Sequence, residues 1–243
     1  MRIVVTAGPT REYLDPVRFL SNPSTGKMGF AIAAEAVRRG HDVTLVAGPV
    51  ALKTPKGAHR VDVVSARDML AAVKVMLTVP AAPSLRGAVT AGPASATPRG
   101  RGGYDEVVFI STAAVADWRP AKCAAKKLKK GEMSGVLKLV RNPDILKTLA
   151  GLRRARRSRL AVAGLKLVGF AAETNDVLKE AARKCREKGL AFIVANDVTK
   201  KGSGFGTDTN RVAFVFPDGA VKKFPLMTKR MVAKRILDEV SRL

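Results

Sequence analysis

Hydrophobic residues along this chain alternate between short continuous runs and stretches in which they recur every three or four positions. The continuous runs predict strands at Arg2–Ala7, Asp42–Ala47, Arg60–Val64, Glu106–Ser111, Val136–Val140, Leu165–Phe170 and Phe192–Val194. The helical spacing predicts helices at Gly26–Arg39, Ala66–Leu77 (with Ser65 as N-cap), Thr174–Lys188 and Lys229–Arg242. Because strands alternate with helices, we expect an α/β fold with a doubly wound, mostly parallel sheet.

The remaining segments complete this predicted fold. A further helix is expected to begin at Asn142-Pro143-Asp144, because proline suits the first turn of a helix. The strands Arg211–Phe216 and Val221–Phe224 flank a Pro-Asp-Gly turn and predict a C-terminal β-hairpin. The segment 79–103 is rich in Pro, Ala and Gly and is interpreted as a surface insertion. With 47% hydrophobic residues, all 243 residues are expected to form one domain.

Polar residues suited to ligand binding follow the first predicted strand. Ligands on such sheets bind beyond the carboxyl ends of the strands, so the loop 7–25 and the segment Ser111–Trp118 are expected to face one crevice. The loop ends at a helix N-terminus, where free N–H groups and the helix dipole favour a phosphate or carboxylate. The side chains expected to gather there are Arg18, Asn22, Ser24, Thr25 and Lys27.

Two common nucleotide motifs resemble this region but do not match it. Gly26-Lys27 is similar to part of a Walker A loop, but Ser21 and Met28 stand where that motif requires glycine and a hydroxyl residue. The run Ser24–Gly29 is similar to a dinucleotide fingerprint, but the segment Val46–Pro49 lacks the acid that would bind the ribose of NAD. An NAD(P)-dependent reductase is therefore disfavoured, though it stays an alternative.

Several of the candidate residues have both a functional and a structural interpretation. Asn22 is either a turn or cap residue or an amide that donates to an acyl or carboxylate oxygen. Asp117 either accepts a hydrogen bond from the exocyclic amino group of a base, or it caps a helix or pairs with Arg119. Phe170, at the end of a predicted strand, is either a core residue or a side chain that stacks on a base.

The candidate lysines leave the same choice open. Lys127 lies in the basic run 126–130, which is either a flap that closes over a triphosphate or a solvated loop. Lys184 and Lys188 are four positions apart on one predicted helix and therefore point the same way. Because Glu180 precedes Lys184 by one turn, a surface ladder of ion pairs is the structural alternative.

The composition is strongly basic, with 44 Lys and Arg against 20 Asp and Glu and a formal net charge of +24. Such an excess favours anionic partners, namely nucleic acid, a membrane surface or phosphorylated small molecules. The arginine-rich block 153–159 is interpreted as a solvated face. Two cysteines without metal-ligand spacing argue against a structural zinc, and with no signal peptide they suit the cytoplasm. No segment approaches the ~18 apolar residues of a membrane span.

A set of longer motifs occurs in a fixed order along the chain. They are Gly8–Glu12, Asp15–Arg18, Ser21–Gly29, Ala113–Asp117, Lys127–Lys130, Asn142–Leu146, Gly169–Thr174 and Ala195–Val198. Together they resemble the motifs of the bacterial phosphopantothenate–cysteine ligases (phosphopantothenoylcysteine synthetases) of coenzyme A biosynthesis. The resemblance covers nearly the whole chain apart from the insertion near 79–103 and the arginine block, and it implies a Rossmann-like fold.

The resemblance also implies a reaction. The carboxylate of 4'-phosphopantothenate attacks the α-phosphate of CTP, which gives an acyl-cytidylate and pyrophosphate. The amine of L-cysteine then displaces CMP and forms the amide. The mixed anhydride supplies a good leaving group, while Mg²⁺ and lysines neutralise the triphosphate. The Mg²⁺ ligands are not identified by the sequence.

The resemblance assigns roles to individual residues. Asn22 would be catalytic by holding the acyl intermediate for the second half-reaction, with Arg18 and Ser24 helping it to bind the acyl substrate. Lys127 would be catalytic as the flap lysine that handles the nucleotide in the first half-reaction. The implied nucleotide contacts are Ala113 (through its backbone), Asp117, Lys127, Pro143, Asp144, Ile145, Leu146, Phe170, Lys184 and Lys188.

The resemblance carries expectations about partners as well. In many bacteria the ligase is the C-terminal half of a bifunctional chain whose N-terminal half is a flavin-dependent decarboxylase. Because Met1 directly precedes the first predicted strand, the sequence is either a free-standing ligase or one half of a longer chain, and no flavin is expected in it. A homodimer is implied, with the region Gly204–Phe216 of the C-terminal hairpin at its interface, and an association with the decarboxylase is possible.

One alternative from another class is a basic nucleic-acid-binding protein on a Rossmann-like scaffold. The net charge and the arginine block favour it. Aromatic residues make up only 5% of the chain and are not interleaved with the basic residues, so a stacking platform for bases is not evident. Binding of nucleic acid and membrane association are therefore not expected.

Overall fold

The structure of the protein is a computed structural model, and it describes residues 1–78, 106–129, 131, 135–154 and 164–243. The predicted insertion at 79–103 and most of the arginine block lie outside the described residues.

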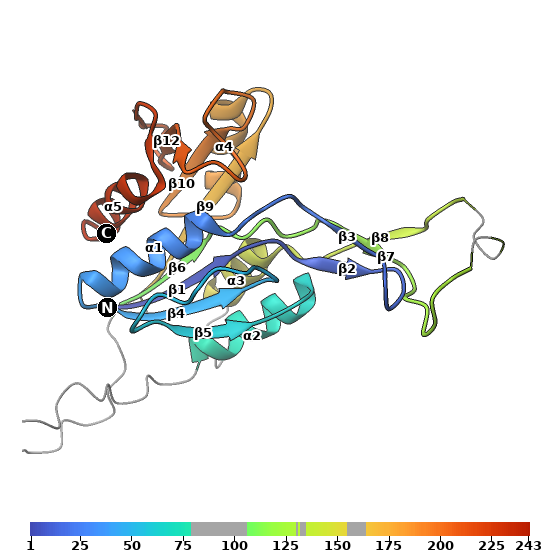
Figure 1. The fold of residues 1–243 in the computed structure, drawn as a ribbon. Coiled ribbons are helices and arrows are strands. Elements are labelled where there is room, and N and C mark those ends of the chain that lie inside the picture. Colours follow the sequence, from blue (N-terminus) through green and yellow to red (C-terminus); the bar gives the residue numbers. More distant parts are fainter. Residues whose placement is uncertain (79–105, 130, 132–134, 155–163) are drawn as a thin grey trace, which may run out of the picture.

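An eight-stranded sheet forms the centre of the molecule (Figure 1). Its order is β13-β12-β10-β9-β6-β1-β4-β5. The strands are β1 (Arg2–Ala7), β4 (Asp42–Ala47), β5 (His59–Asp62), β6 (Val107–Ser111), β9 (Leu165–Glu173), β10 (Phe192–Asp197), β12 (Val212–Val215) and β13 (Val221–Lys223). The pairs from β5 across to β10 are parallel, and β12 and β13 add an antiparallel edge. The predicted mostly parallel sheet with a C-terminal hairpin is confirmed.

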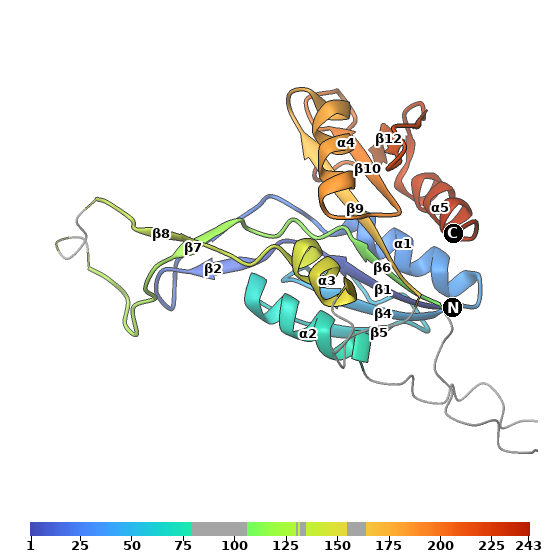
Figure 2. The same ribbon diagram turned by 180° about the vertical axis from the view of Figure 1, so that it is seen from behind.

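Helices cover both faces of the sheet, as Figures 1 and 2 show from opposite sides. They are α1 (Lys27–Arg38), α2 (Ala66–Thr78), α3 (Ile145–Arg154), α4 (Val177–Glu187) and α5 (Lys229–Val240). Side chains alternate across a strand, so Ile3 and Val5 pack with α1 and α5, whereas Val4 packs on the opposite face with α2, α3 and α4. A continuous apolar run in β1 is therefore what a sheet buried on both faces requires.

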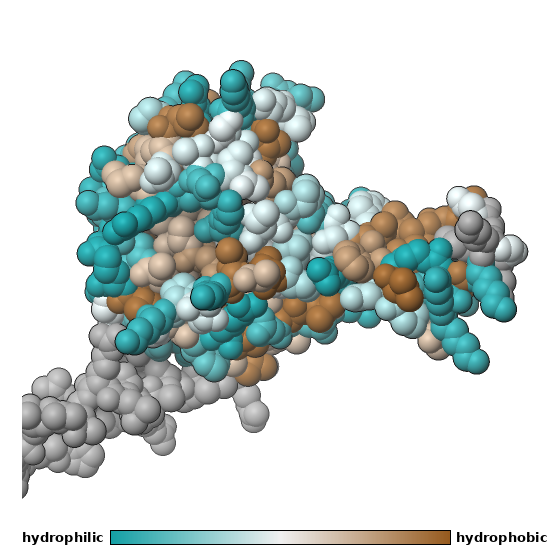
Figure 3. Space-filling view, in the orientation of Figure 1, coloured by the Kyte–Doolittle hydropathy of each residue, from teal (hydrophilic) through white to brown (hydrophobic). Residues whose placement is uncertain are grey.

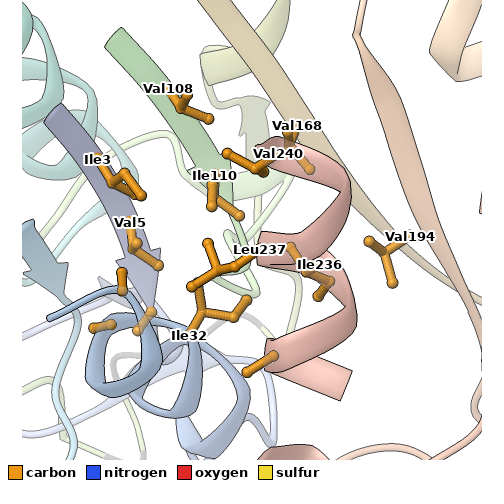
Figure 4. Packing of buried hydrophobic residues seen from close by; sticks show 14 of the residues in the cluster. Ile3, Val5, Ile32, Val108, Ile110, Val168, Val194, Ile236, Leu237 and Val240 are labelled. Atoms are coloured by element: carbon orange, nitrogen blue, oxygen red, sulfur yellow. The ribbon is translucent and has the colours of Figure 1, made fainter. Parts of the chain in front are cut away.

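The face under α1 and α5 forms a dense apolar core (Figure 4). Ile32 of α1 and Leu237 of α5 are fully buried and lie over Ile110 of β6. Burial of each such side chain stabilises the fold by roughly 1.5–3 kcal/mol. This packing fixes α1 against the sheet, and the N-terminus of α1 is a boundary of the cavity described below.

The prediction of a loop over 7–25 is wrong in part, because this segment contains a hairpin of β2 (Arg11–Tyr13) and β3 (Phe19–Ser21). A second hairpin pairs β7 (Trp118–Pro120) with β8 (Leu139–Arg141). Both hairpins project from the carboxyl edge of the main sheet, and β2 contacts β7 (Figures 1 and 2). We call these four strands and their connections the arm. Three-residue strands are too short to show an alternating pattern, which is why the sequence did not indicate β2, β3 and β7.

Several predicted boundaries shift in the structure. Strand β8 begins at Leu139, whereas the sequence predicted a strand at Val136–Val140. The chain before α4 is irregular, and the helix starts at Val177 rather than Thr174. Strands β9 and β10 continue past their predicted ends to Glu173 and Asp197, and a short sheet pairs β11 (Thr209–Asn210) with β14 (Met227–Thr228).

Glu35 of α1 joins this helix to its surroundings through ion pairs. Its buried carboxylate accepts hydrogen bonds from Arg38 at 2.7 Å and from Arg39 at 2.8 Å. Arg39 also pairs with Asp238 of α5 at 2.7 Å. The hydrogen bond from Arg38 has the largest effect on the pKa of Glu35 and lowers it. Burial raises this pKa, but the bonds from Arg38 and Arg39 together outweigh burial and lower the pKa from 4.5 to about 2. A carboxyl group whose pKa is lowered by folding stabilises the fold at pH values above its ordinary pKa. That contribution is lost as the pH falls towards 2.

We therefore expect Glu35→Gln to lower the free energy of unfolding by roughly 1–2 kcal/mol at pH 7 and by much less near pH 2.5, where the wild-type carboxyl group is losing its charge. Urea denaturation at the two pH values measures this difference. The control is Glu187→Gln, because Glu187 forms an exposed ion pair with Arg183 and should change stability little at either pH. An equal loss for Glu35→Gln at both pH values would contradict the prediction.

Candidate functional site

A cavity of ≈ 460 Å³ opens at the carboxyl edge of the parallel strands. Its volume lies within the range of about 300–1,000 Å³ typical of small-molecule sites. Most of its wall comes from Asn22, Ser24–Gly29, Ser111–Asp117, Asn142–Leu146 and Phe170–Glu173, with Lys184 of α4, Lys188 at the end of α4, Asn196, Phe205, Asn210 and Lys229. The predicted convergence of the first loop and the segment after β6 is therefore confirmed.

The N-terminus of α1 forms part of the cavity wall. Gly26 is its N-cap with φ +78°, a left-handed conformation that favours glycine, and no side chain caps the helix. At Gly29 a Cβ atom would lie 2.5 Å from Cβ of Ala7 and 2.5 Å from Oγ1 of Thr112. Glycine at this position lets the first turn of α1 lie directly against the ends of β1 and β6. Free N–H groups of the helix therefore lie at the cavity, where they favour an anion.

We expect Gly29→Ala to push the first turn of α1 away from β1 and to destabilise the protein by roughly 1–3 kcal/mol. Gly151, in the exposed part of α3, is a matched control, because a Cβ atom there meets nothing within 4 Å. Gly151→Ala should stabilise the helix by about 0.5–1 kcal/mol. Thermal unfolding measures both changes, and equal melting temperatures for the two variants would contradict the close packing at Gly29.

The backbone of the segment Ala113–Asp117 is fixed by hydrogen bonds from two sides. On one side Ala114 N–H donates to the carbonyl oxygen of Gly8 at 2.9 Å. On the other side Asn142 donates from its backbone N–H to the carbonyl oxygen of Asp117 at 2.8 Å and from Nδ2 to that of Ala116 at 2.9 Å. Two of the alternatives for Asp117 are wrong: a strand and not a helix follows it, and Arg119 donates to the carbonyl oxygen of Arg141 instead of pairing with Asp117.

Asn22 lies in the cavity wall and contacts this same segment. Its Nδ2 donates to the carbonyl oxygen of Ala114 at 3.0 Å. Ser24 lies in the wall as well and accepts a long hydrogen bond of 3.4 Å from the N–H of Gly26. The amide predicted to handle an acyl group and the segment predicted to contact a base therefore lie next to each other.

Lys184 of α4 and Lys188, the C-cap residue of this helix, reach carboxylates on the cavity wall. Lys184 pairs with Glu173 at 2.5 Å, and Lys188 pairs with Asp144 at 2.7 Å. Asp144 also caps α3 by accepting from the N–H of Lys147. Burial raises the pKa of Asp144, but these donors outweigh burial and lower it. The alternative prediction, in which Glu180 forms a ladder of ion pairs with these two lysines, is wrong, because Glu180 pairs with Arg183.

A short loop, Gly204–Asp208, closes another side of the cavity and is held by two lysines. Lys229 is buried and donates to the carbonyl oxygens of Gly204 at 3.1 Å and Thr207 at 2.6 Å. Lys27 donates to the carbonyl oxygen of Gly206 at 2.9 Å and pairs with Asp208 at 2.7 Å. Burial and the nearby charge of Lys27 lower the pKa of Lys229. The sequence did not predict a role for Lys229 at the site, because it indicated only that this residue begins the last helix.

Two predicted site residues lie outside the cavity wall. Lys127 is exposed in the connection between β7 and β8. Arg18 lies in the hairpin connection between β2 and β3, where it pairs with Asp15 at 2.7 Å. The expectation that Arg18 gathers with the other donors at the N-terminus of α1 is wrong, and the reason is the hairpin that the sequence did not indicate. The other predicted contacts, including Phe170 and Pro143–Leu146, lie in the wall.

The described part of the chain contains no group of three or more His, Cys, Asp or Glu side chains placed to hold a metal ion. None of the helices in the same residues is long and apolar enough to cross a membrane.

The fold and the cavity define an α/β protein of Rossmann-like topology with a cavity beyond the carboxyl ends of its parallel strands. Residues 1–83 and 103–243 match the family described as the DNA/pantothenate metabolism flavoprotein C-terminal domain. The chain belongs to this family.

Named relatives give the family more detail. The coenzyme A biosynthesis bifunctional protein CoaBC of Escherichia coli (strain K12) is 42% identical over 243 residues, which are 99% of this chain and 51% of that protein. This chain thus spans about half the length of the curated relatives that it matches. A crystal structure of the C-terminal domain of CoaBC is 39% identical with a TM-score of 0.70, and the match covers 98% of this chain and 93% of that one. A mutant of Cab2 in complex with phosphopantothenate-cysteine, only 14% identical, shares the fold with a TM-score of 0.69 over 99% of this chain and 85% of that one.

Proposed function

We propose that this chain catalyses the CTP-dependent ligation of 4'-phosphopantothenate and L-cysteine through an acyl-cytidylate, as a step of coenzyme A biosynthesis. The observation that carries the proposal is the contact between Asn22 and the segment Ala113–Asp117 inside one cavity. An activated acyl group must lie between the nucleotide that activates it and the amine that accepts it. A donor amide bonded to the base-binding segment suits that position. The match to CoaBC along 99% of this chain supports the same reaction.

The wall of the cavity offers matching chemistry for each part of the nucleotide. The small side chains of Ala113–Ala116 let a flat base approach the backbone, and the exposed carboxylate of Asp117 can accept from an amino or hydroxyl group. Lys184 and Lys188 carry positive charge on the same wall. Phosphate oxygens can compete with Glu173 and Asp144 for these ammonium groups, so binding of the triphosphate would exchange one anionic partner for another.

Magnesium suits this site as an ion that enters with CTP. Mg²⁺ keeps most of its ligands as water and phosphate oxygens and needs only one or two protein carboxylates, so the carboxylates of Glu173 and Asp144 fit such an ion without a dedicated cage. When bound, the ion would neutralise charge on the triphosphate. The chain itself would supply the lysines, the amide of Asn22 and the N–H groups of α1.

Asn22 would act in the second half-reaction. The attack of an amine on the acyl carbon places negative charge on the carbonyl oxygen, and an amide N–H donor stabilises that charge. The bond from Asn22 to Ala114 fixes the orientation of the amide beforehand. Lys127 would act in the first half-reaction, as an ammonium carried by the arm towards the triphosphate.

The test is a half-reaction assay with Asn22→Asp. We expect the wild-type protein to release pyrophosphate when it is mixed with CTP, Mg²⁺ and phosphopantothenate, and to release CMP only after L-cysteine is added. Asn22→Asp removes the donor and adds a negative charge, so it should keep pyrophosphate release and lower transfer to cysteine about 100-fold or more. Pyrophosphate and CMP are measured separately, with ATP in place of CTP as a second series.

Asn175→Asp serves as the matched control, because Asn175 is exposed and lies outside the cavity wall. It should leave both half-reactions unchanged. Product formation at the wild-type rate by Asn22→Asp would remove the role of Asn22. Absence of pyrophosphate release with either nucleotide would end the proposed function.

We also propose that the chain acts as a homodimer in the cytoplasm, and that the arm supplies the contact. Exposed large hydrophobic side chains gather on the arm (Figure 3), namely Val17, Phe19, Trp118, Val136, Leu137 and Leu139. Large exposed apolar patches are typical of interaction sites. The interface expected near Gly204–Phe216 has less support, because β12 is buried inside its own sheet. Sedimentation equilibrium of the wild-type chain and of Leu139→Asp tests the arm, since only the variant should be monomeric.

A further inference from the structure

Ala116, in the wall of the cavity, is bound through its backbone by side chains from two distant parts of the chain. Its N–H donates to Oγ1 of Thr10 at 3.0 Å, and its carbonyl oxygen accepts from Nδ2 of Asn142 at 2.9 Å. The backbone N–H of Asn142 also donates to the carbonyl oxygen of Asp117 at 2.8 Å. We call Thr10 and Asn142 the clamp. Its three bonds fix three successive peptide units of the chain that follows β6.

Both members of the clamp are themselves held in place by the fold. Thr10 is fully buried in the connection between β1 and β2, and its carbonyl oxygen accepts from Oγ of Ser21 at 2.8 Å. Asn142 directly follows β8 and directly precedes Pro143, and a residue before proline is restricted to extended backbone conformations. The clamp is therefore formed by the chain alone, without a ligand.

The side chain of Asn142 is hydrogen-bonded at one end only. Its Oδ1 atom is buried and has no hydrogen-bond partner among the described residues. The bond from Nδ2 determines this orientation, because an amide oxygen in its place would face the carbonyl oxygen of Ala116 and could not bind it. A buried acceptor without a partner costs free energy. Stability alone therefore does not explain an asparagine at this position, whereas a role in placing the backbone does.

We propose that Thr10 and Asn142 are positioning residues that determine which base the protein accepts, because they fix the backbone against which the base lies. This inference rests on the role proposed above for the segment Ala113–Asp117 in nucleotide binding. The neighbouring Val115 lies in the cavity wall, and its backbone N–H and carbonyl groups form no hydrogen bond within the described part of the chain. Backbone groups held in one position pair with the edge of one base and leave a polar group unpaired against another.

A comparison of CTP with UTP isolates the contribution of the base. The two nucleotides share the ribose and the triphosphate, but cytosine carries an amino donor where uracil carries a carbonyl acceptor. A backbone released from the clamp can turn to pair with either edge. Loss of the clamp should therefore reduce the difference between the two nucleotides rather than abolish the reaction.

The first experiment measures the backbone itself and does not depend on activity. Amide hydrogen exchange of the full chain is followed by NMR at the N–H of Ala116. Thr10→Val removes the acceptor but keeps the shape of the side chain, so we expect this N–H to exchange about tenfold faster. Asn142→Ala should also accelerate it, because the bond on the other side of Ala116 is lost. Thr10→Ser keeps a hydroxyl group and should exchange at a rate close to that of the wild type.

Thr44→Val is the matched control for the change from threonine to valine. Thr44 is also buried, but it lies in β4 and outside the cavity wall. This variant should leave exchange at Ala116 at the wild-type rate. An unchanged rate in Thr10→Val, or the same acceleration in Thr44→Val, would overturn the proposal.

The second experiment measures selectivity through pyrophosphate release at varied concentrations of CTP and UTP. For Thr10→Val and Asn142→Ala we expect the KM for CTP to rise about tenfold with kcat near the wild-type value, and the ratio of kcat/KM for CTP to that for UTP to fall by a similar factor. Asn142→Ala also removes the unpaired Oδ1, so its melting temperature should stay close to that of the wild type. A purely structural role would not change the ratio of the two nucleotides.

The outcomes separate this inference from the proposed function. If the wild type releases pyrophosphate but both variants keep its ratio of CTP to UTP, or show a defect only in transfer to cysteine, the inference is wrong and the proposed function stands. Equal use of CTP and UTP by the wild type would also overturn it. A wild type that releases no pyrophosphate with any nucleotide would end the proposed function and the base selectivity together, while amide exchange would still decide whether the clamp fixes the backbone.

Discussion

The hydrogen bonds that join the chain after β1 to the chain after β6 determine the geometry of the whole site. Gly8 and Ala114 exchange a backbone bond just beyond the sheet, and Asn22 adds a side-chain bond to the same residue. The chain runs from β1 to β4 and β5 on one side and then crosses to β6, which lies on the other side of β1. The cavity opens at this topological switch point because neighbouring strands there send their loops apart. These few bonds place Asn22 and the segment Ala113–Asp117 relative to each other in the wall.

Charge is arranged around the cavity as exchangeable pairs. Lys27, Lys184 and Lys188 each bind a carboxylate of the chain in this structure. The high net charge of the sequence therefore does not appear in the cavity as bare ammonium groups. An anionic ligand would have to displace these carboxylates from the lysines. This requirement favours a ligand with several phosphate oxygens over a ligand with a single charge. Buried Lys229 is different, because it binds backbone carbonyl oxygens and holds the wall in place.

The sequence was sufficient for the parts of the fold that long apolar patterns encode. The buried strands of the parallel sheet and the helices α1, α2 and α5 have strong periodicity, so their positions were predicted closely. The arm was predicted only in part: the expected strand Val136–Val140 overlaps β8, but β2 and β3, with three residues each, carry no readable period. This error explains the wrong location expected for Arg18. Asn142 and Lys229 have roles that depend on contacts between segments far apart in the chain, and a single sequence does not show such contacts.

Two connections of the chain begin and end at the edge of the sheet opposite the cavity. One leaves α2 at Thr78 and rejoins at Glu106 before β6, and the other leaves α3 at Arg154 and rejoins at Gly164 before β9. Both rejoining points are at the amino ends of parallel strands, whereas the cavity is lined by segments at the carboxyl ends of β1, β6, β9 and β10. These two points are therefore natural places to attach a fluorophore, an affinity handle or a solid support without obstructing the cavity.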